Sequence, residues 1–293
     1  MIGIDWGGSG FRAYRIGPDG SVLERRAAAS GIAGLEEGTD YPAVLQQRIG
    51  DWLAADTGPV LLSGMVGSRQ GWREAAYVTC PAGLTDLAAA CCPVEIGNGR
   101  IGHIVPGLSC RDANGVPDVM RGEEMQLFGL DLPVGAAMAV LPGTHSKHAH
   151  LLDGRVTGFS TMMTGEIFAL LSSHGLIAAM LPQKETDFDE AGFHAGVLAS
   201  GQPGGLLHHL FGVRSRRLFG ELAMAAAPDF LSGLLIGHEL RDTIWRGQAQ
   251  IIAGQNLAKR YLKACGWLGI AAAIAPEDAA ARGLYRLSRF LPG

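Results

Sequence analysis

The first residues able to do chemistry lie at the start of the chain, where an apolar stretch runs into Asp5-Trp6-Gly7-Gly8-Ser9-Gly10. Asp5 ends a predicted strand and can hold a cation through water, since Mg²⁺ keeps much of its hydration. Gly7 and Gly8 let the backbone come close to a phosphate and offer it N–H groups, and Ser9 adds a hydroxyl. A tight β-hairpin that contains an acidic residue by chance is the alternative interpretation.

A second charged group stands where a predicted apolar helix begins. It consists of Arg121, Glu123 and Glu124. Acidic residues in a first helical turn ordinarily complement the helix dipole, and that interpretation stays open. The functional interpretation assigns Glu123, in preference to Glu124, to take a proton from a substrate hydroxyl. Arg121 would then hold a substrate anion or orient the base.

Another turn rich in glycine and hydroxyl groups follows the predicted strand 136–141. Gly143, Thr144 and His145 offer donors to a phosphate, and Lys147 suits a phosphate or a substrate carboxylate. A metal site is disfavoured here, because no carboxylate or further ligand matches the cluster of His145, His148 and His150.

Three other turns carry weaker signals. Arg69 and Trp72 follow a short apolar strand and would supply a carboxylate partner and an apolar wall, although a solvated loop is the alternative. Glu166 either complements the dipole of a predicted helix or binds sugar hydroxyls. Gly254 and Gln255 stand at a strand–helix junction, where glycine lets an adenine or ribose lie against the backbone.

The secondary-structure elements predicted around these residues occur in the same order in each half of the chain. Apolar alternation and turn signals predict a strand, a polar glycine turn, a second strand, an Asp-Gly turn and a third strand in each half. The predicted strands are 1–5, 11–16 and 22–28 in the first half and 136–141, 149–152 and 156–159 in the second. In the first half a helix at 41–54 and a buried parallel strand at 59–64 complete a βββαβ unit. We interpret this as a duplicated fold with one phosphate loop in each half.

Helical spacing dominates the rest of the chain. Thr164 is the predicted N-cap of its helix. The glycines at 233 and 237 predict close packing against a neighbouring helix. Helices are predicted at 84–90, 167–173, 188–198, 204–218, 230–240, 257–264 and 277–290, with strands at 250–253 and 267–275.

Composition limits the function classes. The chain has 293 residues, of which 47% are hydrophobic and 18% charged, so it can bury a substantial core. A net charge of −4 argues against a nucleic-acid partner. No apolar run reaches the roughly 20 residues that span a bilayer, and no signal peptide is recognisable, so no membrane partner is expected. Five cysteines without metal or disulfide spacing indicate a cytoplasmic protein.

The order of these motifs resembles the actin/hexokinase/Hsp70 superfamily of ATP-binding folds and, more narrowly, the 2-dehydro-3-deoxygalactonokinase family. The residues that carry the resemblance are Ile4-Asp5-Trp6-Gly7, Gly64-Met65-Val66-Gly67-Ser68 with Gly71-Trp72, Val119-Met120-Arg121-Gly122-Glu123-Glu124, Pro142-Gly143-Thr144-His145-Ser146-Lys147, Met163-Thr164-Gly165-Glu166, 230–237 and Ala253-Gly254. The first loop departs from the family pattern, because Gly8-Ser9-Gly10 stands where Ser-Thr-Asn or similar residues are usual. Phosphate contacts there would rest more on backbone N–H groups.

The resemblance implies an α/β fold of two ribonuclease-H-like (actin-like ATPase) domains with an inter-domain cleft. We expect an N-terminal lobe at 1–132, a C-terminal lobe at 133–275 and a closing helix at 276–293 that packs back on the first lobe. The implied reaction is the ATP-dependent phosphorylation of the C6 hydroxyl of 2-dehydro-3-deoxy-D-galactonate, in D-galactonate breakdown.

The resemblance also implies roles for the candidate residues. Glu123 would be the base, and Asp5 would position Mg²⁺. The phosphates of ATP would contact Gly7, Gly8, Ser9, Gly143, Thr144 and His145. Gly254 and Gln255 would contact the nucleoside. The candidates for the sugar acid are Arg69, Trp72, Arg121, Lys147 and Glu166.

Two rival functions and one question of assembly remain open from the sequence. The first rival is a kinase for another sugar acid, such as 2-dehydro-3-deoxygluconate, which differs at one stereocentre. The second is a non-catalytic regulator that binds a nucleotide or sugar without turnover, which fits poorly with two phosphate loops and Glu123. A homodimer is left open.

Overall fold

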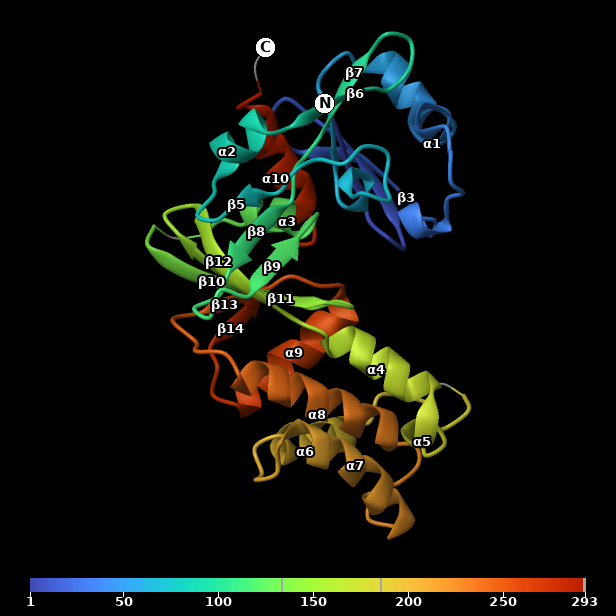
Figure 1. The fold of residues 1–293 in the computed structure, drawn as a ribbon, viewed down its shortest axis with the longest axis vertical. Helices are drawn as coiled ribbons and strands as arrows, with labels where there is room; N and C mark the ends of the chain where they lie inside the picture. The colour runs from blue at the N-terminus through green and yellow to red at the C-terminus, as the bar shows by residue number, and fades with distance from the viewer. Residues whose placement is uncertain (133, 185, 292–293) are drawn as a thin grey trace. The chain divides into compact units, whose positions relative to one another are not determined.

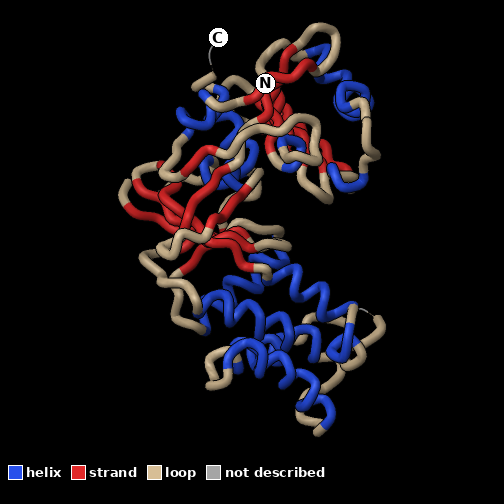
Figure 2. The backbone as a smooth tube through the Cα atoms, in the orientation of Figure 1, coloured by secondary structure: helices blue, strands red, loops and turns tan. Residues whose placement is uncertain are grey.

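The structure is a computed structural model that describes residues 1–132, 134–184 and 186–291. The chain divides into two compact units. The first comprises Met1–Ala136, Ala149–Ser160 and Ala275–Gly293, and the second comprises Ala137–His148 and Thr161–Ile274. Figures 1 and 2 show the elements of each unit. No helix in the described residues is long and apolar enough to cross a membrane.

A six-stranded mixed sheet in the order β3-β2-β1-β4-β7-β6 forms the centre of the first unit. Its strands are β1 (Ile2–Trp6), β2 (Phe11–Ile16), β3 (Val22–Ala28), β4 (Val60–Ser63), β6 (Cys92–Glu95) and β7 (Ile101–Ile104). β1 is antiparallel to β2 and parallel to β4, and its pairing places Asp5 opposite Ser63. The predicted βββαβ unit is therefore confirmed, because the helix between β3 and β4 makes the crossover that a parallel pair requires.

That crossover helix is α1 (Tyr41–Ala55). Asp40 caps it by accepting a hydrogen bond from the Ala43 N–H at 3.0 Å. Its buried face, which includes Leu45 and Trp52, packs into the core formed with Ile4 and other sheet residues. A hydrophobic stripe on one side of a helix is stable only when it is covered in this way.

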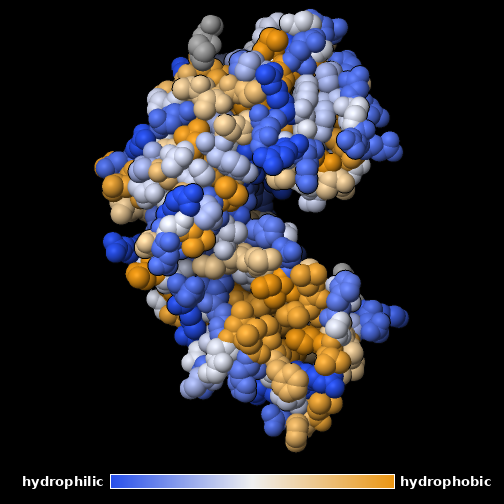
Figure 3. Space-filling model, viewed as in Figure 1, coloured by the Kyte–Doolittle hydropathy of each residue, from blue (hydrophilic) through white to orange (hydrophobic). Residues whose placement is uncertain are grey.

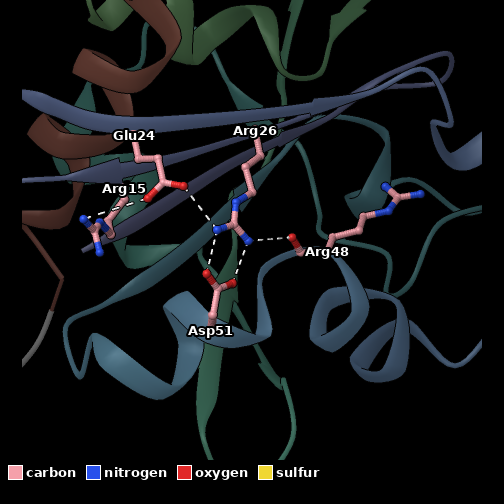
Figure 4. Close-up of polar contacts among 5 residues, drawn as sticks. All are labelled: Arg15, Glu24, Arg26, Arg48 and Asp51. Carbon is pink, nitrogen blue, oxygen red and sulfur yellow. Dashed lines mark hydrogen bonds and ion pairs between the residues drawn. The ribbon is translucent and has the colours of Figure 1, made fainter.

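A charge network between β3 and α1 also holds these two elements together (Figure 4). Arg26 of β3 donates to both carboxylate oxygens of Asp51 at 2.6 Å, to the Arg48 carbonyl at 3.1 Å and to Glu24 at 3.2 Å. Its guanidinium also lies 4.4 Å from the ring centroid of Trp52. A planar guanidinium suits two-point binding of a carboxylate together with stacking on an aromatic ring.

The first unit contains further short helices and strands. They are η1 (Ile32–Gly34), η2 (Met65–Gly67), β5 (Val78–Thr79), α2 (Leu84–Ala89), β8 (Leu108–Arg111), β9 (Pro117–Met120), α3 (Glu123–Phe128) and α10 (Ala279–Ser288). β5, β8 and β9 form a small sheet that the sequence patterns did not indicate. α10 packs on α3, and Arg286 donates to the carbonyls of Phe128 and Leu130 at the end of α3. A cation at a helix C-terminus satisfies carbonyls that have no partner within the helix.

A five-stranded sheet in the order β12-β11-β10-β13-β14 repeats the arrangement. Its strands are β10 (Ala136–Leu141), β11 (Ser146–Leu152), β12 (Arg155–Met162), β13 (Ala249–Ile251) and β14 (Ala272–Ile274). β10 is parallel to β13, and β13 is parallel to β14. The predicted repetition of three hairpin-connected strands is confirmed by this order.

The helices of the second unit are α4 (Thr164–Ser173), α5 (Gly175–Ala178), α6 (Glu190–Ala199), α7 (Gly205–Leu218), α8 (Ala227–Arg241) and α9 (Gln255–Trp267). α8 is buried along nearly its whole length and packs tightly on α6. A Cβ on Gly233 would lie 2.1 Å from the Phe193 carbonyl oxygen, so only glycine permits this separation. The predicted close packing is confirmed. Figure 3 shows apolar side chains gathered over helices of this unit, and the exposed ones include Leu170, Leu207 and Phe211.

Two expectations about local structure were wrong. Trp267 does not begin a strand, because it ends α9 and packs on Phe193, and only Ala272–Ile274 are extended. Thr164 is not a cap, because it is the first residue of α4 and its hydroxyl bonds to Glu239 instead. In both places a tertiary contact overrides the local preference.

Candidate active site

The first glycine loop is a tight turn between β1 and β2. The Gly7 N–H donates to the Gly10 carbonyl at 2.9 Å. The carbonyls of Gly7 and Gly8 accept hydrogen bonds, both at 2.9 Å, from the N–H groups of Ile32 and Ala33. These bonds fix the loop from outside the hairpin. Ser9 at its tip is exposed and can reach a ligand.

Asp5 lies beside this loop, where β1 and β4 both end. Its carboxylate is 3.6 Å from Arg12 Nη1, and its side chain is 13% exposed. Burial raises the pKa of Asp5, the nearby Arg12 guanidinium opposes that rise, and the charge of Glu123 adds to it. Asp5 and Glu123, which are 118 residues apart in sequence, therefore lie close enough for their charges to interact.

Glycine makes this approach possible. Gly64, directly after β4, has φ +94°, and a Cβ there would lie 2.7 Å from the Trp6 carbonyl oxygen and 3.4 Å from Asp5 Oδ1. Gly122, directly before α3, has φ +105°. Positive φ and missing side chains bring the end of β4 and the start of α3 to the Asp5 carboxylate.

The adjacent carboxyl groups of α3 have different surroundings. Glu123 is half-buried, and its Oε2 accepts the Arg121 N–H at 3.0 Å. Glu124 is fully buried, and its Oε2 accepts the Gly122 N–H at 2.6 Å. Burial, followed by the charge of Glu123, raises the pKa of Glu124 to about 8. Of these two glutamates, only Glu123 can therefore contact a ligand that enters from solvent.

Arg121 is held rigidly next to these carboxyl groups. The residue is 9% exposed, its Nη2 donates to the Ala75 carbonyl at 2.7 Å, and its guanidinium lies 4.3 Å from the ring centroid of Tyr77. Within the described residues, its Nε and Nη1 have no hydrogen-bond partner, and neither has the buried hydroxyl of Ser68. Arg121, Tyr77 and Ser68, together with Arg69, line a cavity of about 330 Å³. Buried donors without acceptors suit an incoming anion.

The structure places Arg69 and Trp72 on the loop after η2. Arg69 is 87% exposed and pairs with Glu74 at 3.6 Å. The Trp72 ring stacks on Tyr41 with centroids 5.3 Å apart and planes 4° apart. Both Arg69 and Trp72 line a cavity of about 750 Å³ that also reaches Gly8. An aromatic wall beside the first glycine loop can pack against the carbon face of a sugar.

In the second unit, the loop 143–145 lies against the start of α4. A Cβ on Gly165 would come within 2.3 Å of the Gly143 carbonyl oxygen, and the Glu166 N–H donates to the Thr144 carbonyl at 3.0 Å. His145 Nε2 lies 2.5 Å from Glu166 Oε2. Glu166 thus orients a histidine of the loop, a contact that neither sequence interpretation contained.

The structure places the other candidates of this loop inside the unit. Lys147 is 4% exposed, and its Nζ donates to the His145 carbonyl at 3.3 Å. His148 is fully buried, with Nδ1 2.6 Å from Thr243 Oγ1 and Nε2 2.7 Å from Glu239 Oε1.

A cavity of about 500 Å³ adjoins the same loop. Gly143 and Gly165 border it on one side, and α8 and α9 provide much of the rest. Arg260 lines the cavity, pairs with Asp229 at 2.7 Å and lies 4.5 Å from the ring centroid of Phe188. A mainly apolar cavity with a few fixed polar groups is typical of a site for a nucleoside.

Gly254 and Gln255 stand at the start of α9, as N-cap and first residue, and the residues that follow them line this cavity. Sequence reasoning missed the lining residues Ser232, Asn256 and Arg260. Asn256 follows directly after the predicted pair, so the junction was the available signal. Ser232 and Arg260 belong to helices whose inward face the sequence could not orient toward a cavity.

Comparisons with known proteins agree with this arrangement. A family model described as 2-keto-3-deoxy-galactonokinase matches residues 5–287. A 2-dehydro-3-deoxygalactonokinase of Escherichia coli (strain K12) is 36% identical over 292 residues, which cover 98% of this chain and 97% of that protein. A probable 2-dehydro-3-deoxygalactonokinase of Rhizobium meliloti (strain 1021) is 39% identical over 245 residues, or 82% and 79% of the two chains.

Solved structures agree as well. A crystal structure assigned to a 2-dehydro-3-deoxygalactonokinase of Sinorhizobium meliloti superposes with a TM-score of 0.88 at 34% identity and covers 99% of this chain and 96% of that chain. A structure assigned to an N-acetylglucosamine kinase of Porphyromonas gingivalis has a TM-score of 0.50 at 12% identity and covers 99% of both chains, which bears on the fold alone. The α/β fold expected from the resemblance is confirmed. The chain belongs to the 2-keto-3-deoxy-galactonokinase family.

Proposed function

We propose that this protein transfers the γ-phosphoryl group of ATP to the C6 hydroxyl of 2-dehydro-3-deoxy-D-galactonate. Glu123 takes the hydroxyl proton, the C6 oxygen forms a bond to the γ-phosphorus, and the bond to the bridging oxygen of ADP breaks. Catalysis of this kind rests mostly on positioning and charge neutralisation. Family membership and the chemistry of the candidate residues support the proposal.

One observation carries the assignment of the base. Asp5, at the end of β1, and Glu123, at the start of α3, lie close enough for their charges to interact, whereas Glu124 is buried with a pKa raised to about 8. A base must be reachable and ionised at neutral pH, and of the two glutamates only Glu123 is reachable. Asp5 is therefore not assigned as the base.

We assign Asp5 to hold Mg²⁺. The Asp5 carboxylate, whose pKa is raised by burial and by the charge of the neighbouring Glu123, suits a divalent cation, which would neutralise the excess negative charge. Asp5 would hold the ion through water, and the ion would supply charge neutralisation on the phosphates. Arg12, 3.6 Å from Asp5, would have to share the carboxylate with this hydrated ion.

We propose that the loop of Gly7, Gly8 and Ser9 binds phosphate oxygens through the N–H groups of Gly8 and Ser9 and the Ser9 hydroxyl, while Gly7, whose N–H donates to the Gly10 carbonyl, lets the backbone come close to the phosphate. Gly143, Thr144 and His145 would bind phosphate oxygens from the second loop. The nucleoside would occupy the 500 Å³ cavity that Gly143 borders, with Gly254 and Gln255 at the nearby start of α9. The Glu166 carboxylate, 2.5 Å from His145, supports this arrangement by holding the imidazole in place.

The sugar acid would bind in the first unit. Arg121 is the favoured partner of its carboxylate, because the guanidinium is buried, fixed by Ala75 and Tyr77, and has unused N–H groups. Arg69 would assist from the rim of the same cavity, and Trp72 would pack against the carbon chain. Lys147 and Glu166 are weaker candidates, since one is buried and the other is engaged with His145.

We propose that the reaction takes place in the cytoplasm, because all five cysteines are free thiols, as expected in a reducing compartment. ATP consumption measured against a panel of six-carbon keto-deoxy acids tests the function. We expect turnover with 2-dehydro-3-deoxygalactonate. A strong preference for 2-dehydro-3-deoxygluconate would transfer the assignment to that acid, and nucleotide binding without turnover of any acid would indicate a regulator.

A further inference from the structure

At the centre of the second unit, Glu239 of α8 is hydrogen-bonded to residues of three other segments, β11, α4 and α9. Its Oε1 accepts the Ser146 hydroxyl at 2.6 Å and lies 2.7 Å from His148 Nε2. Its Oε2 accepts the Tyr261 hydroxyl at 2.7 Å, and the Thr164 hydroxyl bonds to the same carboxylate. The side chain of Glu239 is 1% exposed.

The carboxylate of Glu239 is stable as an anion in this place. Burial raises its pKa, but the hydrogen bond and charge interaction with His148, together with the hydrogen bonds from Ser146 and Thr164, outweigh burial and bring the pKa below its ordinary value. Buried charges are tolerated only when hydrogen bonds satisfy them, and removing one partner is costly. The hydrogen bonds among these segments therefore all depend on the Glu239 carboxylate.

Three of the four partners of Glu239 are residues of the proposed nucleotide site or their direct neighbours. Ser146 follows the loop Gly143–His145 without an intervening residue. Thr164 starts α4, and both Thr164 and Tyr261 line the 500 Å³ cavity. Glu239 itself does not line that cavity but borders another, of about 580 Å³, on α8. It therefore acts on the nucleotide site through its partners.

We infer that Glu239 is the positioning residue of the nucleotide site, holding the second phosphate loop, the start of α4 and Tyr261 of α9 in their binding arrangement. The inference rests on the proposed function, since it takes the cavity beside Gly143 as the place of the nucleotide. The exposed pair of His145 and Glu166 links the same loop to α4 from the solvent side. Glu239 is the buried counterpart of that link.

The test is Glu239→Gln, which keeps the shape of the side chain and removes its charge. We expect the KM for ATP and the Kd for ADP, measured by calorimetry, to rise about tenfold, because a neutral amide cannot accept four donors. The KM for the sugar acid is expected to stay within about twofold, since that acid is assigned to the first unit. A role in folding alone would lower kcat with the folded fraction and leave both KM values unchanged.

Glu190→Gln is the matched control. It is the same chemical change in the same unit, but Glu190 is more than half exposed and pairs with Lys263 at 2.7 Å on the surface. Its ATP parameters are expected to equal those of the wild type. If Glu239→Gln is folded and its ADP affinity lies within about twofold of the wild type, the inference is overturned.

Two single substitutions test the inference if Glu239→Gln does not fold. Ser146→Ala and Tyr261→Phe each remove one hydrogen bond and are expected to weaken ADP binding about two- to fivefold, and unchanged affinity in both would also overturn the inference. A wild-type protein that binds no ADP and phosphorylates no acid would refute the proposed function itself. Normal wild-type activity with unaffected variants would refute only the role of Glu239.

Discussion

Gly122 lies directly against Gly64, so that a Cβ on Gly122 would come within 3.1 Å of the Gly64 Cα and 3.9 Å of Asp5 Oδ1. Both glycines have positive φ values. The contact joins the start of α3 to the end of β4, and it sets where Glu123 stands relative to Asp5. The geometry of the proposed base therefore depends on two residues that have no side chain.

Gly122→Ala tests this dependence. We expect a loss of about 1–3 kcal/mol of stability from the strained φ and the new contact, together with a fall in kcat of at least tenfold. Gly99→Ala is the control, because Gly99 also has a positive φ (+72°) but no atom within 4 Å of its would-be Cβ. It should lose stability only. Chemical denaturation and steady-state kinetics measure both effects, and full activity of Gly122→Ala would contradict the proposed geometry.

Glu123→Gln should abolish the base and leave binding intact. We expect kcat to fall by on the order of 10²–10⁴, with ADP affinity unchanged. Rapid-mixing measurement of the phosphoryl-transfer step distinguishes this effect from slow product release. Turnover at the wild-type rate would remove Glu123 from the mechanism.

Asp5→Asn should weaken the use of Mg²⁺. The amide is a neutral and poorer partner for a hydrated dication, so the Mg²⁺ concentration at half-maximal rate is expected to rise about tenfold or more. The KM for the sugar acid should change by less than about twofold. A magnesium titration at saturating ATP provides the measurement, and a curve that superposes on that of the wild type would refute the metal role.

Glu124 predicts a dependence of stability on pH. Its pKa in the folded protein is about 8, above its ordinary value near 4.5, so its stabilising contribution is complete below about pH 4.5 and is lost as the pH rises through about 8. Glu124→Gln resembles the protonated acid. We expect its free energy of unfolding, measured by chemical denaturation, to match that of the wild type near pH 5 and to exceed it at pH 9 by an amount of the order of a few kcal/mol. A constant difference across this pH range would show that Glu124 is not buried as described.

Arg121→Lys distinguishes the two candidate arginines of the first unit. A lysine keeps the charge but cannot stack and bind a carboxylate at two points, so the KM for the sugar acid should rise about 10- to 100-fold. Arg69→Lys should change it by less than about threefold, because Arg69 is 87% exposed and pairs with Glu74. The opposite order would assign the carboxylate to Arg69.

Local patterns of the sequence predicted much of the fold. An apolar run that ends at Asp5 predicted β1, an apolar run that ends in glycine predicted β4, and turn signals predicted the hairpins, because strand and turn preferences act over a few residues. The same patterns failed at Trp267, where a contact with Phe193 continues α9, and they did not indicate the small sheet of β5, β8 and β9. Short strands of two to four residues carry too little periodicity to be recognised.

The candidate site, like the fold, could be predicted from the sequence only in part. Motifs along the chain were enough to predict which residue types could bind phosphate and accept a proton, since Asp5, Glu123 and the two glycine loops stand in recognisable patterns. The burial of Glu124, the donors of Arg121 that have no partner within the described residues and the bonds from Glu239 to three other segments became apparent only in the folded protein. The reason is physical: a motif specifies chemistry along the chain, whereas burial, pKa and hydrogen-bond partners depend on residues that folding brings together from distant positions.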